Sequence, residues 1–285
     1  GQNPLWKDLV LMIQKAQNDN LMVWLSPEIE LSPLAVKQLA QQDLSDNWQH
    51  NLSSLYSEFL LFSADLANYM NIEGVIYSTD IPHIYKIENY ANLSELMVIE
   101  LNSQIRNLRS RFQNKIYILV NENLEPTPDL YENVDGFVVA PSIDFLESEY
   151  VKEDIQSTFK AYLVDNVYAK LNEFDKPIFI NLNFPSVKGV ERGCIISDSE
   201  CIDFDVINNL GANSQSLPLE IDLLTQVEMY NAAFGAINDL EWVKGVISLE
   251  YNPQVAIMDF SSSVRGKPAI GVFWYWYPRM LGIEN

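Results

Sequence analysis

Short apolar runs of strand length alternate along this chain with longer segments whose apolar residues recur every three or four positions. The runs predict strands at 22–25, 74–78, 116–120, 136–140, 177–181 and 245–251. The three-to-four repeat predicts helices at 4–16, 48–69, 97–112, 155–171 and 223–237. This alternation is typical of parallel βα units, in which a crossover helix joins neighbouring strands. We therefore expect an α/β fold with six parallel strands.

One crossover departs from this pattern. The connection between the strands 116–120 and 136–140 carries Pro126 and Pro128 and has no clear helical face, so we expect at most a vestigial helix there. No Gly/Ser-rich or repeated segment divides the chain. The sequence therefore predicts a single domain over residues 1–285.

The charge balance restricts the partners. The chain has 39 acidic against 18 basic side chains and a formal net charge of −21. Such a chain repels polyanions, which argues against nucleic acid and anionic membrane surfaces as partners. No stretch approaches the roughly 20 uninterrupted apolar residues of a membrane span. Neutral sugars, cations or simple solubility all remain compatible with this charge.

The two cysteines, Cys194 and Cys201, lie seven positions apart in a polar stretch that we interpret as a loop. A disulfide between them is our first expectation, with two free thiols as the alternative, and it favours an oxidising compartment. A structural zinc site has little support, because the chain has only two histidines. We expect no metal and no cofactor.

Several segments resemble a known family. The segments "LVLMIQKAQNDNLMVWLSP" (9–27), "GVIYSTD" (74–80) and above all "SSSVRGKPA" (261–269) are similar to TIM-barrel glycoside hydrolases of the endo-mannanase-like type. The resemblance implies a (β/α)8 TIM barrel in which the six strands are the family's strands three to eight. It also implies that the chain is N-terminally incomplete, with an upstream segment or other protein subunits completing the barrel.

The resemblance implies hydrolysis by two catalytic glutamates, but this chain has no glutamate at the matching positions. Such enzymes hold two glutamates across the sugar bond, at the ends of strands four and seven, about 5 Å apart in retaining enzymes. At strand four this chain has Asp80. At strand seven the family's "E-x-G-Y-P-S" is matched by "NLNFPS", which places Asn181 at the nucleophile and Asn183 at the glycine; a register shifted by one residue would place Leu182 there instead. Neither Asn nor Leu can form the glycosyl ester.

The strand ends also carry candidate functional residues when the resemblance is left aside. In a parallel barrel Glu28, Asp80, Asn181 and Glu250 would all point toward one mouth. We take Asp80 and Glu250 as candidate catalytic acids, and Glu28, Asn181 and Asn183 as candidate substrate-binding residues. The alternative for each acid is a helix cap or a solvated loop residue.

Aromatic residues near the same strand ends could stack on sugar rings. The candidates are Trp24, Tyr77 and Tyr251, although aromatic residues in barrel strands more often belong to the core. The dense aromatic run 273–277 could pack the last helix against the barrel or form an exposed patch, and we favour packing.

Three hypotheses follow. The first is a glycoside hydrolase-like barrel with a degenerate active site that binds, or weakly acts on, polysaccharide. The second is an active inverting hydrolase that uses Asp80 with Glu250 or Glu28, since inversion tolerates a wider carboxylate gap. The third is a non-catalytic structural domain of an extracellular or surface assembly. We expect an extracellular or cell-surface location and carbohydrate as the partner.

Overall fold

The computed structural model describes ten stretches of the chain. They are residues 4–28, 46–78, 95–121, 128–146, 154–197, 200–202, 204, 207–208, 219–249 and 259–283. The internal contacts divide the chain into two compact units, one ending at Val138 and one beginning at Val139. The single domain expected from the sequence stays a prediction.

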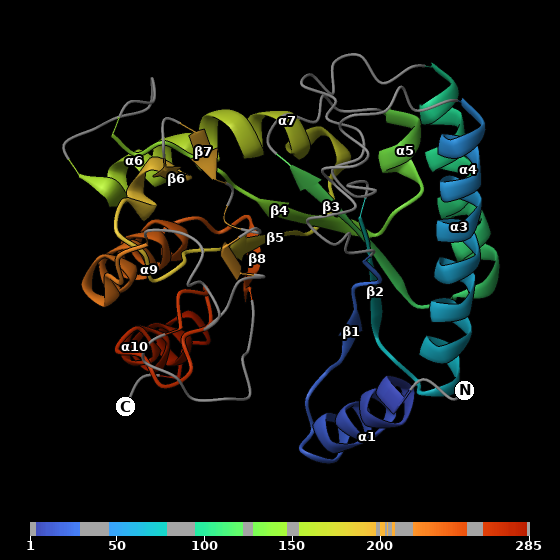
Figure 1. Ribbon diagram of the computed structural model, residues 1–285, viewed down its shortest axis with the longest axis horizontal. Coiled ribbons are helices and arrows are strands. Elements are labelled where there is room, and N and C mark those ends of the chain that lie inside the picture. Colours follow the sequence, from blue (N-terminus) through green and yellow to red (C-terminus); the bar gives the residue numbers. More distant parts are fainter. Residues whose placement is uncertain are drawn as a thin grey trace. The chain divides into compact units, whose positions relative to one another are not determined.

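The central element is a six-stranded sheet with the strand order β1-β2-β3-β4-β5-β8 (Figure 1). Its strands are β1 (Trp24–Leu25), β2 (Gly74–Ser78), β3 (Lys115–Asn121), β4 (Gly136–Ala140), β5 (Ile178–Leu182) and β8 (Val243–Ser248). The pairs β1/β2, β2/β3 and β5/β8 are parallel. The α/β architecture predicted from the strand–helix alternation is confirmed, and the strands 74–78 and 136–140 have the predicted bounds.

The first unit carries four described helices: α1 (Pro4–Asn18), α3 (Asp46–Tyr69), α4 (Glu95–Arg111) and α5 (Pro128–Glu132). α3 and α4 pack side by side (Figure 1). The five-residue α5 is the vestigial crossover helix expected between Pro126 and the strand at 136. On the helix-facing side of β2, Val75 and Tyr77 have no exposed surface, so this strand is a centre of the core.

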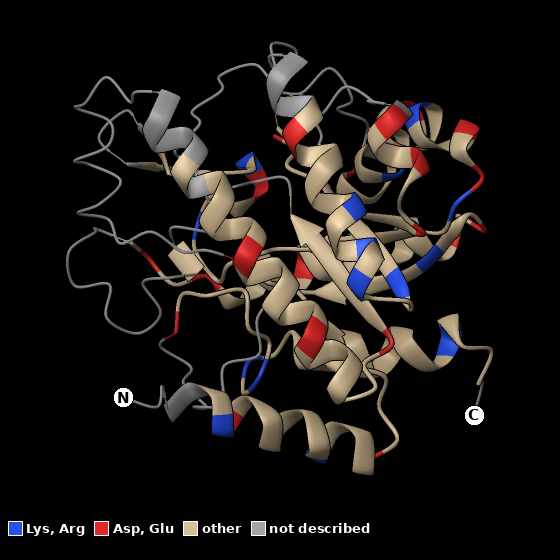
Figure 2. Cartoon of the chain, turned by 90° about the vertical axis from the view of Figure 1, so that its right-hand side faces the viewer, with Lys and Arg blue, Asp and Glu red and all other residues tan. Residues whose placement is uncertain are grey.

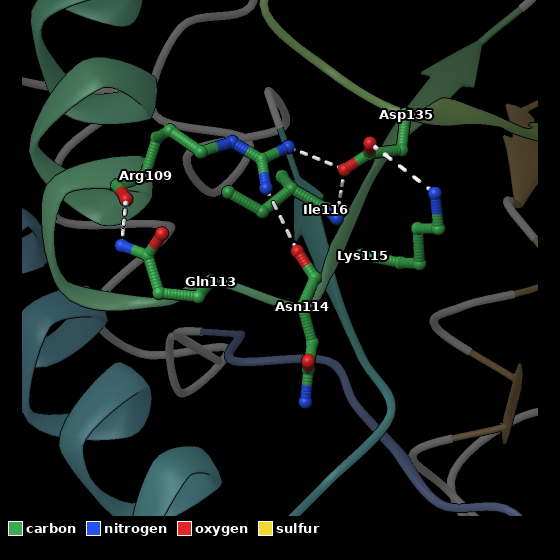
Figure 3. A network of polar contacts seen from close by, with 6 residues as sticks. All are labelled: Arg109, Gln113, Asn114, Lys115, Ile116 and Asp135. Atoms are coloured by element: carbon green, nitrogen blue, oxygen red, sulfur yellow. Dashed lines mark hydrogen bonds and ion pairs between the residues drawn. The ribbon is translucent and has the colours of Figure 1, made fainter.

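A polar cluster joins the end of α4 to the start of β3 (Figure 3). Arg109 pairs with Asp135, and the same carboxylate accepts a 2.8 Å hydrogen bond from the backbone N–H of Ile116. Lys115 lies 3.6 Å from its other oxygen. Burial raises the pKa of Asp135, but the hydrogen bonds from Ile116 and Arg109 and the two positive charges outweigh it and lower that pKa below its ordinary value.

The basic residues of α4 favour its carboxyl end. Arg109 and Arg111 lie in the last turn of α4. Figure 2 shows basic residues gathered toward one end of a helix that faces the viewer. Cations there interact favourably with the negative end of the helix dipole. Arg111 also pairs with Asp65 of α3 at 2.7 Å, with both side chains about half exposed. The pair of Arg111 with Asp65 therefore joins the end of α4 to α3.

The second unit begins with a helix that changes its winding. The predicted helix 155–171 consists of α6 (Ile155–Tyr162), a π-helical segment (Leu163–Tyr168), α7 (Ala169–Leu171) and a 3-10 turn (Asn172–Phe174). Asp154 caps it by accepting from the N–H of Ser157 at 2.8 Å. α9 (Leu223–Asn238) packs against α6, and α10 (Ile270–Met280) packs against α9 (Figure 1).

The polar stretch around the cysteines corrects one expectation. Instead of an irregular loop, β6 (Ile195–Ser197) and β7 (Glu200–Ile202) form an antiparallel hairpin (Figure 1). The predicted disulfide is confirmed and joins Cys194, the residue before β6, to Cys201 in the middle of β7. Gly193, with φ +74°, precedes the hairpin where an added Cβ would lie 2.7 Å from the carbonyl oxygen of Ile143. Only glycine fits this contact.

The aromatic run on α10 packs only in part. Phe273 is buried, with edge-to-face contacts to Tyr230 and Phe234 of α9 at 5.0 Å between ring centroids. Trp274 is 75% exposed, and Tyr275 is exposed with Arg279 stacked 3.5 Å from its ring centre. The expected packing therefore holds for Phe273 and is wrong for Trp274. Among the described helices, none has the length and apolarity needed to cross a membrane.

Candidate functional site

The carboxyl end of β5 presents an amide on the face turned away from α9. Ile180 and Leu182 have no exposed surface, and Phe184 contacts Tyr230 of α9, so this alternate set faces the helix. Asn181 belongs to the opposite set and is 9% exposed. Its Oδ1 atom is buried and has no hydrogen-bond donor among the described residues. A buried acceptor without a donor costs free energy, so Asn181 is a natural point for a ligand or a water to donate.

Asn183, two residues further on, is held by a polar cluster. Its Oδ1 accepts from Asn208 Nδ2 at 2.9 Å and from the hydroxyl of Ser262. Asn208 Oδ1 in turn accepts from the backbone N–H of Ser262 at 2.9 Å. Asn208 and Ser262 are both almost fully buried. The side chain of Asn183 is therefore fixed by two residues that lie far from it in sequence.

The segment 259–267 is a buried polar turn that supports this cluster. Asp259 accepts from the N–H and the hydroxyl of Ser261, each at 2.8 Å. The Lys267 amine, 2% exposed, donates to the carbonyl of Ser261 at 2.6 Å and to the hydroxyl of Ser186 at 3.0 Å. The turn motif singled out in the sequence is thus tied directly to the segment after β5.

The start of α9 is hydrogen-bonded to the segment after β5 and to the 259–267 turn. Asp222 caps the helix by accepting from the N–H groups of Leu224 and Thr225, and the bond from Thr225 is the main reason that the pKa of Asp222 is lowered. Gln226 donates to the carbonyl of Phe184 at 2.9 Å, and Tyr230 donates to the carbonyl of Ser262 at 3.1 Å. One helix therefore positions both the segment after β5 and the 259–267 turn.

In the first unit, Tyr56 lies at the carboxyl ends of β1 and β2. Its hydroxyl is 3.2 Å from the carbonyl oxygens of both Pro27 and Ser78. Glu28, which follows Pro27, is exposed and accepts from the hydroxyl of Ser26 at 2.7 Å. Burial raises the pKa of Tyr56, and the negative charge of Glu28 adds to this rise. Tyr56 stays a neutral donor that holds two strand ends together.

The two aromatic candidates of this unit differ in their surroundings. Trp24 is partly exposed and stacks on Tyr117 with 4.3 Å between ring centroids. Gly74 makes room for it, because a Cβ there would lie 3.0 Å from the indole. Tyr77 is fully buried, and its hydroxyl donates to Gln104 of α4 at 2.8 Å. This placement does not suit the sugar-stacking role expected of Tyr77, because that role needs an exposed ring face.

The remaining predicted residues divide by location. Asp80, Glu250 and Tyr251 lie outside the described residues. Within the second unit the structure brings Asn181 and Asn183 together at one strand end. Sequence reasoning missed Asn208 altogether, since a single asparagine in a long polar segment carries no signal. No group of three or more His, Cys, Asp or Glu suited to a metal ion occurs in the described part of the chain.

Comparisons with known proteins agree with this architecture. No protein-family model and no curated protein matches the chain. Among solved structures, a GH113 beta-1,4-mannanase superimposes with a TM-score of 0.65 at 17% identity, covering 95% of this chain and 78% of the mannanase. The GH113 beta-mannanase AaManA from Alicyclobacillus acidocaldarius gives a TM-score of 0.63 at 18% identity, with 98% and 78% covered. The chain has the fold of the TIM-barrel glycoside hydrolases.

A more distant neighbour has the same architecture. A fungal beta-1,4-galactanase superimposes with a TM-score of 0.53 at 11% identity, covering 93% of this chain and 80% of the galactanase. At these identities the likeness establishes the fold, and function depends on the residues at the strand ends. The resemblance to mannanase-like barrels inferred from the sequence segments is thereby confirmed at the level of the fold.

Proposed function

We propose that this chain is a carbohydrate-binding domain with the fold of a glycoside hydrolase, in which double-displacement hydrolysis is lost. The proposal rests on the identity and surroundings of Asn181. It lies at the carboxyl end of β5, where barrel enzymes place reacting groups, and offers a buried oxygen that has no donor among the described residues.

An amide at this position can bind but cannot react as a nucleophile. In a retaining glycosidase a carboxylate attacks the anomeric carbon, expels the leaving group and forms a glycosyl ester. The amide oxygen of Asn181 carries no negative charge, and its attack would give a cationic imidate rather than an ester. The same oxygen is a good acceptor for a sugar hydroxyl.

The surroundings of Asn181 support a neutral polyol ligand. Asn183, two residues after Asn181, forms an uncharged hydrogen-bonded cluster with Asn208 and Ser262. Sugar hydroxyls both donate and accept, so they match such a set without requiring a charge. The structural neighbours are described as mannanases and a galactanase, and the formal charge of −21 disfavours polyanionic ligands.

The wild-type protein provides the test. Isothermal titration calorimetry with manno-, xylo- and gluco-oligosaccharides should detect binding, while chromatography of the same mixtures should show no hydrolysis. Asn181→Leu keeps a similar volume but removes the acceptor, and should abolish binding without unfolding the protein. Ordinary turnover with retention of configuration would contradict the proposal.

Two other outcomes would select the alternatives. Inversion of configuration that disappears in Asp80→Asn would favour an inverting hydrolase with Asp80 as its acid. Neither binding nor turnover with any oligosaccharide would favour a structural domain and would contradict carbohydrate binding by this site.

We also propose an extracellular or cell-surface location. The disulfide between Cys194 and Cys201 supports it, because such bonds form and persist in oxidising compartments. Fractionation of the native host with an antibody to the chain, together with thiol labelling before lysis, tests this placement; a reduced cytoplasmic protein would contradict it.

A further inference from the structure

We infer that the outer face of α3 is a docking surface for a basic amphipathic helix of a partner protein. The surface, which we call the outer stripe, consists of large apolar residues that recur at intervals of four and three: Leu55, Phe59, Phe62, Leu66 and Tyr69. The inference concerns the first unit and does not depend on carbohydrate binding at Asn181.

The outer stripe is not the face that α3 turns toward the core. Leu55 is 61% exposed, Phe62 is 48% exposed and Tyr69 is 81% exposed, while Phe59 and Leu66 are partly exposed. The inward face is formed by a different set of residues, all nearly or completely buried: Ser53, Tyr56, Leu60, Ser63, Ala64, Ala67 and Met70. The three-to-four repeat that predicts this helix from the sequence therefore belongs to its outer face.

The spacing of the outer stripe suits a second helix. Leu55, Phe62 and Tyr69 are seven positions apart, so they lie almost on one line along α3. With Phe59 and Leu66 they repeat like the a and d positions of a heptad, which is the pattern of two packed helices. The line from Leu55 to Tyr69 is about 21 Å long, enough to contact about four turns of a partner. Contiguous exposed apolar residues with a polar border mark interaction surfaces.

The described neighbours of α3 leave the outer stripe accessible. α1 contacts α3 through Trp6, whose ring meets Phe62 edge-on with 4.4 Å between centroids. Gln17 of α1 also donates to the carbonyl of Met70 at 2.7 Å. Phe62 and Tyr69 remain exposed despite these contacts. α3, at the right of Figure 1, faces the viewer in Figure 2.

The charges beside the outer stripe select the partner. Glu58 and Asp65 follow Leu55 and Phe62 by three positions, which places each acid beside the stripe. α3 contains no Lys or Arg, and Arg111 of α4 pairs with Asp65, so Glu58 supplies most of the attraction. Charges that flank an apolar seam determine which helices pair. A helix with Lys or Arg beside its own apolar stripe therefore complements α3.

A second copy of this chain is a poorer occupant. Pairing α3 with the α3 of another copy would bring the Glu58 and Asp65 side chains of both copies to one seam, and α3 offers no basic residue in exchange. The formal net charge of −21 adds repulsion between copies. The occupant that we assign is therefore a cationic helix.

Two synthetic peptides test the assignment. Each has about three heptads with leucine at the a and d positions, and the remaining positions are lysine in one peptide and glutamate in the other. Fluorescence anisotropy of the labelled peptides measures binding to the wild-type protein. We expect the lysine peptide to bind at least about tenfold more tightly than the glutamate peptide, with an affinity that falls as salt is raised. Equal affinities, or no binding of the lysine peptide, would overturn the inference.

Variants of the chain locate the binding surface. Combining Leu55→Ser with Tyr69→Ser removes two exposed side chains of the outer stripe and should weaken binding of the lysine peptide by at least about tenfold. Glu58→Gln should weaken it by about threefold and reduce its salt dependence. Trp274→Ser is the matched control, because this residue of α10 is 75% exposed and lies outside α3, and it should leave the affinity unchanged. Circular dichroism checks that each variant is folded.

The outcomes separate the outer stripe from other surfaces. If the double variant binds like wild type, or if Trp274→Ser weakens binding as much as the double variant does, the assignment to α3 fails. Sedimentation velocity of the wild-type protein alone gives a second check, and we expect a monomer. A dimer that the Leu55→Ser and Tyr69→Ser double variant dissociates would make a second copy the occupant and overturn the assignment of a cationic helix.

Discussion

The amine of Lys267 lies 3.0 Å from the hydroxyl of Ser186, and both side chains are almost completely buried. Ser186 itself donates to the backbone carbonyl of Asp259 at 2.7 Å, while Lys267 also donates to the carbonyl of Ser261. A long cationic side chain is rarely buried to this extent, because it must find acceptors for its donors. Lys267 therefore fastens the 259–267 turn to the segment that follows β5.

Removing this amine should destabilise the protein. Lys267→Ala leaves two buried acceptors with fewer donors and creates a cavity, and we expect a loss of about 3 kcal/mol. Lys267→Met keeps most of the apolar stem and should cost about half as much. Urea unfolding followed by fluorescence measures both variants. Equal losses for Ala and Met would contradict the stem contribution, and no loss in either variant would contradict the fastening role of the amine.

Asp135 should stabilise the protein in a pH-dependent way. Its folded pKa is lowered, so the stabilisation is present above the unfolded pKa of about 4 and is lost as pH falls through the folded value. Asp135→Asn should cost about 1 to 2 kcal/mol at neutral pH, and the difference from wild type should shrink in acid. Asp65→Asn is the matched control, because its exposed pair with Arg111 should contribute less than about 0.5 kcal/mol.

Two glycines with positive φ separate backbone strain from steric clash. Gly189→Ala meets open space at φ +91° and should cost about 1 kcal/mol through strain alone. Gly193→Ala adds a collision with the carbonyl of Ile143 and should cost at least about 2 kcal/mol. Thermal melts of the two variants provide the comparison. A Gly193→Ala variant as stable as Gly189→Ala would show that the contact between these loops yields easily.

The disulfide should contribute through the unfolded chain. It closes a loop with a sequence separation of seven, and replacing both cysteines by serine should cost about 2 kcal/mol in the loop-entropy description. Urea unfolding of the double variant and of wild type gives the difference. Two titratable thiols in unreduced, unfolded wild-type protein would contradict the bond itself.

Much of the fold could be predicted because its signals are local. The runs at 74–78 and 136–140 are apolar, bounded by turns and long enough to pair, so their bounds coincide with β2 and β4. The hairpin at 195–202 was missed because each arm has only three residues. The π-helical segment at 163–168 was missed because one short π-helical turn within an α-helix barely disturbs a repeat of three and four.

The site was less predictable because its roles depend on tertiary contacts. The motif around Asn181 located the strand end. It did not show that the Asn181 oxygen lacks a donor among the described residues, nor that Asn183 makes buried hydrogen bonds. Tyr77 shows what the alternation of residues along a strand cannot predict. The alternation separates the two faces of the strand, but it does not say which face the helices cover. Asn208 acquires its role only because the chain returns to bring it against Ser262.

The affinity of the wild-type protein for sugar should depend little on pH. Asn181, Asn183, Asn208 and Ser262 do not titrate, so wild-type affinity for mannotetraose should be nearly constant between about pH 5 and pH 8.

Asn181→Asp should introduce a titration with a raised pKa, because burial disfavours the carboxylate. Binding by this variant should strengthen as pH rises through that pKa, since an ionised acceptor makes the stronger hydrogen bond. Its stability should fall over the same range, because the unfolded chain releases the proton more readily. Calorimetric titrations and urea unfolding at matched pH values measure the two trends, and a wild-type affinity that varies about tenfold would place a titrating acid in the site.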